Sequence, residues 1–109
     1  MKLSILRRSL PLVLGATLVA GMSHVSMAQT VKIGSLSAVT GPIANLVPPI
    51  IEAEQLAVKQ VNDAGGILGG RKLELVVGDT QCNAQASVDA AGKLVNVEQV
   101  VAIVGALCS

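Results

Sequence analysis

An apolar, uncharged run near the carboxyl end constrains the fold of this chain more than any other stretch. Residues 100–104 read Val-Val-Ala-Ile-Val, and residues 105–109 continue as Gly-Ala-Leu-Cys-Ser. A short continuous run rich in β-branched residues is typical of a central strand in a parallel sheet, buried on both faces. Open α/β sheets bind their ligands beyond the carboxyl ends of such strands. We therefore expect a binding site to begin where this run ends.

Two strand–helix pairs precede the run. Residues 31–35 and 73–77 have the apolar pattern of short strands, whereas residues 50–62 and 84–96 repeat apolar side chains at helical spacing. Alternating strands and helices of these lengths predict an α/β fold, a partial doubly wound parallel sheet in the order β-α-β-α-β. The expected spatial order of the strands is 2-1-3.

Local signals predict where the helices begin and end. Pro48-Pro49 is typical of a first helical turn, Gly65 of a residue just past a helix, and Asn83 of an N-cap. We expect the first helix to turn a broad apolar face to the sheet and the second to lie close to the sheet through small side chains. These faces comprise Ile50, Ala53, Leu56, Ala57, Val58 and Val61 in the first helix, and Ala86, Ala90 and Leu94, with Ala91 and Val95 beside them, in the second.

The first 28 residues have the three-part pattern of a secretory signal peptide. Their start is basic, residues 10–22 are mostly apolar, and Ser26-Met27-Ala28 places small residues before a cleavage point. An uncleaved anchor is the alternative, but a membrane span needs about 20 apolar residues. Cleavage after Ala28 would leave residues 29–109 as one small exported domain.

Charge and composition exclude several classes of function. Residues 29–109 carry five Lys or Arg and seven Asp or Glu, and the chain has no Phe, Trp or Tyr. A nucleic-acid partner needs clustered basic residues, which this pattern lacks, so we expect no such partner. Without aromatic side chains, the core must be built from Val, Ile, Leu and Ala.

The two cysteines are the most informative side chains. Cys82 follows the second expected strand and Cys108 follows the third. Both lie at the same edge of the sheet in a chain sent to an oxidising compartment, which favours a disulfide over two free thiols. In the order 2-1-3 these strands are about 9–10 Å apart, whereas bridged Cα atoms are about 4.4–6.8 Å apart. The two loops must therefore lean together over the end of the first strand.

Sequence motifs for catalysis are missing. The only histidine, His24, lies in the expected signal peptide, so no Ser–His or Cys–His pair remains after cleavage. Two cysteines fall short of the usual four zinc ligands, and the first strand is not followed by a dinucleotide fingerprint. Asp79 is interpreted as a loop or capping acid rather than a catalytic one. We expect a protein that is not an enzyme and holds no metal or cofactor.

A binding surface remains as the expected site. Residues 35–42 and Cys108-Ser109 are rich in hydroxyl groups and small residues, and both follow strands at the carboxyl edge of the sheet. Ser109 stands where a further helix would begin, and a hydroxyl with free amides there suits a carboxylate. Plain helix capping is the alternative role for Ser109.

Six segments carry a resemblance to a known family through their order and spacing. They are Val31-Lys-Ile-Gly34, Thr40-Gly-Pro-Ile-Ala44, Ala57-Val-Lys-Gln-Val-Asn-Asp-Ala-Gly-Gly-Ile67, Gly69-Gly-Arg-Lys-Leu-Glu-Leu75, Gly78-Asp-Thr-Gln-Cys82 and Ile103-Val-Gly-Ala-Leu-Cys-Ser109. Together they resemble the start of periplasmic branched-chain amino-acid-binding proteins. The resemblance implies that residues 29–109 are the N-terminal part of the first lobe of a type I periplasmic binding fold. In that fold two α/β lobes close on an amino acid.

The resemblance also implies roles for four residues. Ser109 matches the serine that holds the α-carboxylate of the ligand, and Cys82 and Cys108 match a disulfide of the first lobe. Leu46 lies near a position that is aromatic in leucine-binding members. That departure leaves the bound amino acid open, since relatives bind other amino acids, amides or urea.

The implied function is the substrate-binding component of an ABC importer. Its expected partners are a small amino acid and the membrane permease, and we expect a monomer. The groups that hold the ammonium of the ligand, the hinge and the second lobe would lie beyond Ser109, so we expect residues 29–109 alone to bind weakly or not at all. A ligand-sensing regulatory domain of the same fold is the second hypothesis, and an enzyme on a doubly wound sheet is the third.

Overall fold

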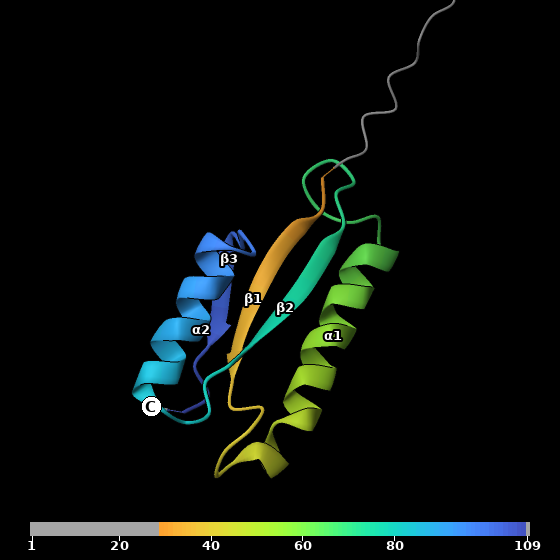
Figure 1. Cartoon of the computed structure of the whole chain (residues 1–109). Coiled ribbons are helices and arrows are strands. Elements are labelled where there is room, and N and C mark those ends of the chain that lie inside the picture. The colour runs from red at the N-terminus through yellow and green to blue at the C-terminus, as the bar shows by residue number, and fades with distance from the viewer. Residues whose placement is uncertain (1–28, 109) are drawn as a thin grey trace, which may run out of the picture.

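A computed structural model describes residues 29–108 of the chain (Figure 1). The expected signal peptide, residues 1–28, and Ser109 lie outside the described residues. The strand order is β2-β1-β3 and both pairings are parallel, which confirms the predicted class and topology. In chain order the elements are β1 (Val31–Ser37), the 3-10 turn η1 (Ala44–Leu46), α1 (Pro48–Asp63), β2 (Leu73–Asp79), α2 (Ala84–Asn96) and β3 (Ala102–Gly105).

The two helices cover opposite faces of the sheet (Figure 1). In the parallel register Ile33 of β1 pairs with Leu75 of β2, and the next residue, Gly34, pairs with Val76. Because alternate side chains of a strand point to opposite faces, Ile33 and Leu75 lie under α1 and Gly34 lies under α2. In this doubly wound arrangement, the loops that lead to helices on both faces of the sheet meet at the carboxyl ends of the strands.

Helix α2 lies close to the sheet because glycine replaces a side chain beneath it. A Cβ at Gly34 would lie 3.0 Å from Leu94 Cδ1, and a Cβ at Gly78 would lie 3.1 Å from the same atom. Leu94 is only 2% exposed. The predicted inward row of Ala86, Ala90 and Leu94 is therefore confirmed, whereas Val95, which was expected beside it, is 52% exposed. Asn83 caps the helix by accepting from the Gln85 and Ala86 amides.

Helix α1 begins and ends where the sequence predicts. Pro48 and Pro49 occupy its first turn. At its end the Gly65 amide donates to the Asn62 carbonyl and the Gly66 amide donates to the Val61 carbonyl, with φ positive at both glycines. These two bonds form a Schellman motif, which is the reason glycine suits this position.

The predicted inward face of α1 is confirmed for Ile50, Val58 and Val61, which are half-buried, and wrong for Ala53 and Leu56, which are exposed. Ile51, Glu54, Val58 and Val61 are half-buried, whereas Leu56 is 55% exposed and points to solvent. The apolar spacing of α1 does not decide which of its sides faces the sheet. Packing of α1 against β2 selects the side on which Glu54 is half-buried. One carboxylate oxygen of Glu54 is buried without a hydrogen-bond partner.

The end of α1 is bonded to the start of β2 through Asn62. Its side-chain amide donates to the Leu73 carbonyl at 2.9 Å, and its side-chain oxygen accepts from the Leu73 amide at 2.7 Å. The Val31 amide donates to the Lys72 carbonyl, so the main-chain groups of Leu73 face away from β1. Asn62 therefore occupies the first pairing position on the outer edge of β2.

The prediction that residues 100–104 form a central strand buried on both faces is wrong for the described residues. β3 pairs only with β1, and three of its four residues are exposed. Helix α2 packs on β2 and β1, so β3 is also more exposed than β2. Apolar β-branched residues indicate a strand, but its burial depends on which neighbours cover it.

Two strands extend further than predicted. β1 continues to Ser37 and β2 to Asp79, so residues assigned to loops belong to the sheet. Val47 and Ala38, in the segment after β1, are buried core residues together with Val31, Leu36 and Leu94. Within residues 29–108, no helix combines the length and the apolar character that crossing a membrane requires.

Candidate binding site at the carboxyl edge of the sheet

The carboxyl ends of all three strands lie at one edge of the sheet (Figure 1). The segment after β1 runs from Ala38 to Val47, and the loop after β2 runs from Thr80 to Asn83. Cys108 lies three residues past the end of β3. The architecture therefore gathers three connecting segments where the sequence predicts a site.

Asp79 joins the first two of these segments. Its carboxylate accepts from the Thr40 hydroxyl at 2.6 Å, the Thr40 amide at 3.1 Å and the Gln81 amide at 3.0 Å. The hydrogen bond from the Thr40 side chain, with those from backbone amides, holds the pKa of Asp79 below its ordinary value. The interpretation of Asp79 as a loop-capping acid is thus confirmed, and its partner Thr40 was not predicted.

Further contacts hold the segment after β1 against the loop after β2. Thr80 is fully buried, its amide donates to the Ser37 carbonyl at 3.0 Å, and its hydroxyl accepts from the Cys82 amide at 3.4 Å. Gly41 has φ of +101°, and a Cβ there would lie 2.7 Å from the Gln81 carbonyl oxygen. Only glycine allows the two loops to approach this closely.

Cys82 and Cys108 form the predicted disulfide, with their Cα atoms 5.2 Å apart. The strands that lead to these cysteines are not neighbours, since β1 lies between them. Gly105 makes the approach possible, because it has positive φ and a Cβ there would collide with the Leu36 carbonyl oxygen. The segment after β3 therefore crosses the end of β1, as the predicted geometry demands.

Two hydroxyl groups lie buried beneath this edge. Ser35 and Ser37, on the α1 face of β1, are 0% and 3% exposed, and their Oγ atoms are 3.3 Å apart. They bond to one another, so they support the edge rather than offer free groups to a ligand.

The structure describes one of the two predicted ligand-binding residues. Leu46 lies in η1 and is 57% exposed, directly before the buried Val47. A hollow of about 270 Å³ is lined by its neighbours in sequence, Ala44, Val47 and Pro48, and by Val39, Ile51 and the charged Glu52, but not by Leu46 itself. The ligand-binding role of Leu46 stays a prediction, and so does that of Ser109, which lies outside the described residues.

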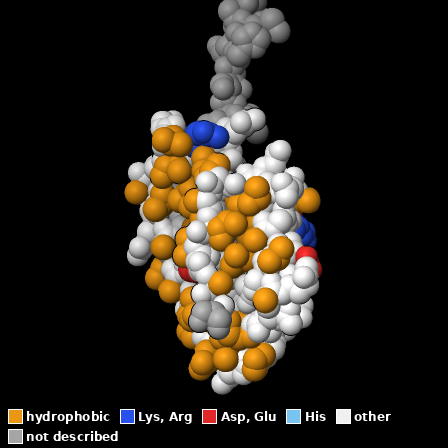
Figure 2. All heavy atoms as spheres, turned by 90° about the vertical axis from the view of Figure 1, so that its left-hand side faces the viewer, with side chains coloured by type: hydrophobic (Ala, Val, Ile, Leu, Met, Phe, Trp, Pro, Cys, Tyr) orange, Lys and Arg blue, Asp and Glu red, His pale blue; other side chains and the backbone are white. Residues whose placement is uncertain are grey.

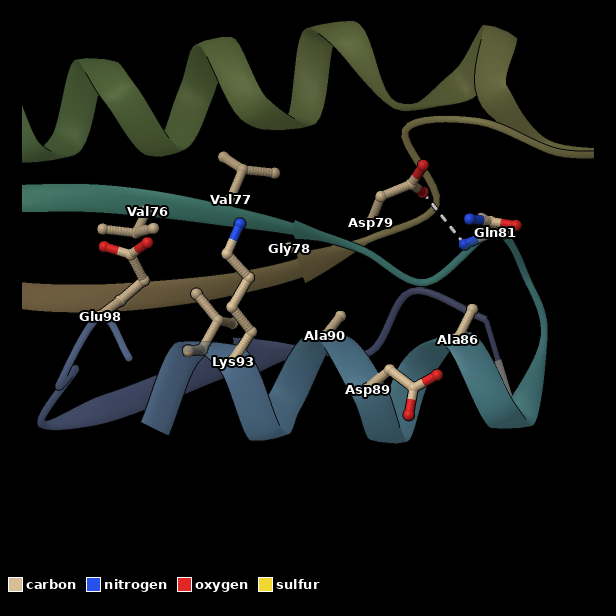
Figure 3. Close-up of a pocket in the computed structure, with 11 residues that line it drawn as sticks. Val76, Val77, Gly78, Asp79, Gln81, Ala86, Asp89, Ala90, Lys93 and Glu98 are labelled. Carbon is tan, nitrogen blue, oxygen red and sulfur yellow. Dashed lines mark hydrogen bonds between the residues drawn. The ribbon is translucent and has the colours of Figure 1, made fainter. Parts of the chain in front are cut away.

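A hollow of about 470 Å³ lies elsewhere, in the groove between β2 and α2 (Figure 3). Asp79 and Gln81 close one end, and Glu98 lies at the other. The Lys93 side chain reaches toward β2, whereas Asp89 points away from the strand (Figure 3). This groove runs along the outer edge of the sheet and does not collect the three strand ends, so we do not assign the binding site to it.

Among residues 29–108, no group of three or more His, Cys, Asp or Glu side chains could hold a metal ion. Backbone amides are the donors that the described edge can offer, because the hydroxyl groups of Ser35, Ser37 and Thr40 are already hydrogen-bonded within the protein. Such groups bind an anionic or polar small molecule by hydrogen bonding.

A model of the periplasmic binding protein family matches residues 30–109. The chain belongs to this family.

The similar proteins of known name bind amino acids. The chain is 38% identical over 95 residues to a leucine-, isoleucine-, valine-, threonine- and alanine-binding protein of Pseudomonas aeruginosa. It is 32% identical over 100 residues to the Leu/Ile/Val-binding protein of Escherichia coli K12. These matches cover 86% and 87% of this chain but only 25% and 27% of the relatives. The chain thus spans about a quarter of their length.

Solved structures show the same periplasmic binding fold. The branched-chain amino acid transporter substrate-binding protein LivJ of Streptococcus pneumoniae, in complex with isoleucine, matches with a TM-score of 0.64 and 32% identity. The leucine-binding protein LivK of Thermotoga maritima matches with a TM-score of 0.63 and 29% identity. The matches cover 71% and 73% of this chain and 22% of each neighbour. The fold class and the family resemblance are therefore confirmed.

The junction of Thr40 with Asp79 is the feature that sequence reasoning missed. A hydroxyl in the loop after the first strand and an acid at the end of its neighbour were both visible, and the predicted strand order makes them adjacent. The missing information was the length of β2, because Asp79 was assigned to a loop rather than to the last residue of the strand.

Proposed function

We propose that residues 29–109 form the first part of the ligand-binding lobe of an exported solute-binding protein. The protein would bind branched-chain or related amino acids in the periplasm and deliver them to the permease of an ABC importer. The observation that carries this proposal is the convergence of three strand ends at one edge, held by the disulfide and by Asp79. Membership of the periplasmic binding protein family supports it.

In this proposal the edge recognises the carboxylate common to all amino acids. Ser109 donates its hydroxyl to the carboxylate, and backbone amides after β3 add to the interaction. Leu46 contacts the ligand side chain from the segment after β1, where it is exposed. The lobe binds and releases solute without chemical change, so the protein is not an enzyme.

A chimera tests the proposed function with a complete binding cleft. Residues 29–109 would replace the matching quarter of the Pseudomonas aeruginosa relative, and isothermal titration would measure leucine, isoleucine, valine, threonine and alanine. We expect at least one of them to bind at micromolar or lower concentration. A folded chimera that binds none of them, while the parent relative does, would overturn the proposal.

Substitution of Ser109 in that chimera tests its role separately. Ser109→Ala removes a hydrogen bond to a charged group, and we expect about a 10- to 100-fold loss of affinity. Ser87→Ala is the matched control, because the Ser87 hydroxyl bonds only to the Asn83 carbonyl at the start of α2. Equal affinity of the two variants would remove Ser109 from the site and leave the transport function standing.

Export is tested on the 109-residue chain itself. Expressed in a Gram-negative host, the chain should be found in the periplasm with Gln29 as its first residue, measured by fractionation and N-terminal sequencing. Retention in the membrane with Met1 intact would instead support the uncleaved anchor.

A further inference from the structure

Only residues 29 and 30 separate the expected cleavage point from the central strand of the sheet. Cleavage after Ala28 makes Gln29 the first residue, and β1 begins at Val31. The Val31 amide donates to the Lys72 carbonyl at 2.8 Å, and Val31 is only 5% exposed. Gln29 and Thr30, by contrast, are exposed and lie outside the strand. The new chain end therefore lies in solvent directly beside the core of the sheet.

Arg71 holds residue 29 at the amino end of the sheet. Its side-chain Nε donates to the Gln29 carbonyl at 2.8 Å. The main chain of Arg71 is itself fixed, because its amide donates to the Ile67 carbonyl at 2.7 Å and its carbonyl accepts from the Ile67 amide at 2.8 Å. Lys or Arg side chains lie at the upper end of the molecule in Figure 2, which is the end where β1 and β2 begin in Figure 1. The carbonyl and the α-amino group belong to one residue, so cleavage frees that amine beside the Arg71 guanidinium.

The charges around residue 29 favour the neutral form of the new α-amino group. A neighbouring cation disfavours the protonated form of an amine, and the neutral form is the nucleophile. Gln29 and Arg71 line an open hollow of about 440 Å³ together with Lys32 and Glu98. The carboxylate of Glu98 is paired with the Lys32 ammonium at 3.4 Å, so its charge is already balanced. Arg71 is thus the charge in this hollow that acts on the amine.

We propose that Gln29 is a modification site, which is converted to pyroglutamate with the help of the Arg71 cation; the proposal rests on the export step of the proposed function. The α-amino nitrogen attacks Cδ of its own side chain. The bond from the nitrogen to Cδ forms, the bond from Cδ to Nε2 breaks, and one proton passes from the α-amine to Nε2, which leaves as ammonia. The reaction closes a lactam ring within one residue, and such intramolecular attack is strongly favoured over attack by a separate amine. The main-chain carbonyl of Gln29 takes no part, so its hydrogen bond from Arg71 is kept.

The modification protects the centre of the sheet. Aminopeptidases act on a free α-amino group, which the lactam replaces. Removal of residues 29–31 from an open chain end would take away Val31 and its hydrogen bond to Lys72. Since β1 pairs with both β2 and β3, a closed chain end guards the strand on which the other two depend.

Mass spectrometry of the exported chain, purified from the periplasm, tests the proposal. The expected mass is that of residues 29–109 with the disulfide formed, less one ammonia. Because the lactam blocks direct sequencing, the chain should read Thr30-Val31-Lys32 only after pyroglutamyl peptidase has removed residue 29. A chain that begins at Gln29 and keeps its ammonia after prolonged incubation would overturn this inference and leave export standing. A chain that begins at any other residue would overturn both this inference and the predicted cleavage, whereas ligand binding by the chimera is measured independently.

The variant Gln29→Glu is the matched control for the chemistry of the side chain. It keeps the size of the residue and the carbonyl that Arg71 contacts, but a carboxylate is a much poorer target for the amine, so the chain end should stay open. An aminopeptidase should then remove residue 29 from Gln29→Glu and not from the parent chain. Equal removal from both chains would show that the parent end is not closed.

Two variants of Arg71 test the role of its cation. Arg71→Met keeps the apolar part of the side chain and removes the charge, so cyclisation should be about twofold slower or more. Arg71→Lys keeps the charge and should cyclise at nearly the parent rate. The rates are measured as the fraction of chains that have lost ammonia at intervals after induction, and circular dichroism checks that the variants fold. Equal rates for Arg71→Met and the parent chain would overturn the role assigned to Arg71.

Discussion

Asp79 is the single residue that does most to shape the candidate site. It ends β2 and accepts three hydrogen bonds, two from Thr40 and one from Gln81. The segment after β1 and the loop after β2 are thereby held as one surface. Because these bonds form before any ligand arrives, a ligand meets an ordered edge and loses less entropy to loop ordering.

Substitution of Asp79 should weaken the fold in a pH-dependent way. Asp79→Asn should lower the free energy of unfolding by about 1 kcal/mol at pH 7, because a charged acceptor of three donors becomes a neutral one. The pKa of Asp79 is lowered in the folded state, chiefly by the Thr40 hydroxyl. The contribution of Asp79 is therefore present above about pH 4 and is lost as the pH falls through the lowered pKa.

Urea unfolding at pH 7 and pH 2.5 measures this dependence. The difference between the parent chain and Asp79→Asn should be clear at pH 7 and small at pH 2.5. Glu74→Gln is the control, since Glu74 is an exposed acid on the same strand. A difference of equal size at both pH values would show that the charge of Asp79 is not what holds the loops.

Several residue-level predictions follow directly from local chemistry, and others do not. Asn83 as an N-cap and Gly65 as a helix end depend on neighbours within a few residues, so sequence alone predicts them correctly. Leu56 was expected to face the sheet and is exposed instead, because the inward face of α1 depends on how the helix packs on β2. Side-chain spacing contains no information about that rotation.

At the scale of elements, glycines under α2 set the distance between helix and sheet. Leu94 lies above both Gly34 and Gly78, and Ala90 lies above Gly78. The small residues of α2 were a correct sign of close packing. The glycines that face them were not recognised, because their partner positions depend on the strand register.

Two glycine substitutions should change the stability of the fold in opposite directions. Gly78→Val places atoms against Leu94, Leu36 and Ala90, and overpacking of this kind costs about 1–3 kcal/mol. Gly92→Ala, on α2, meets no atom nearer than 4.0 Å and should stabilise the chain by about 0.5–1 kcal/mol through helix propensity. Thermal unfolding of both variants measures the two shifts. Stabilisation by Gly78→Val would contradict the close packing of α2.

The order of the elements was more predictable than their burial. Alternation of strands and helices, with right-handed crossovers, leaves few topologies, and β2-β1-β3 is among them. The environment of β3 was mispredicted because it depends on what lies beside the strand rather than on Val101 or Ile103 themselves. Ser109 remains a prediction for the separate reason that it lies outside the described residues.

At the scale of the whole molecule, the disulfide is the direct link between the two outer strands. β2 and β3 have no hydrogen bonds to one another, and the bond between Cys82 and Cys108 spans 26 residues of sequence. Among residues 29–108 the buried apolar core is small, with five side chains from β1, the segment after it and α2. A covalent constraint therefore carries a large share of the stability.

Removal of the disulfide should unfold a large fraction of the molecules. Closing a loop of this size stabilises by roughly 3 kcal/mol on the chain-entropy model. The double variant Cys82→Ser, Cys108→Ser should show a correspondingly lower urea midpoint, and reduction of the parent chain should reproduce it. The variant itself should be insensitive to reductant. An unchanged urea midpoint would mean that the noncovalent contacts at the carboxyl edge hold the fold together without the disulfide.

The spacing of the two cysteines also determines when this edge can be completed. The ribosome makes Cys82 first and must add 26 more residues before Cys108 exists. At about 5–20 residues per second this takes roughly 1–5 s, during which Cys82 is a lone thiol. If export carries Cys82 into the oxidising compartment before Cys108 follows, a thiol of a second chain can bond to Cys82 first.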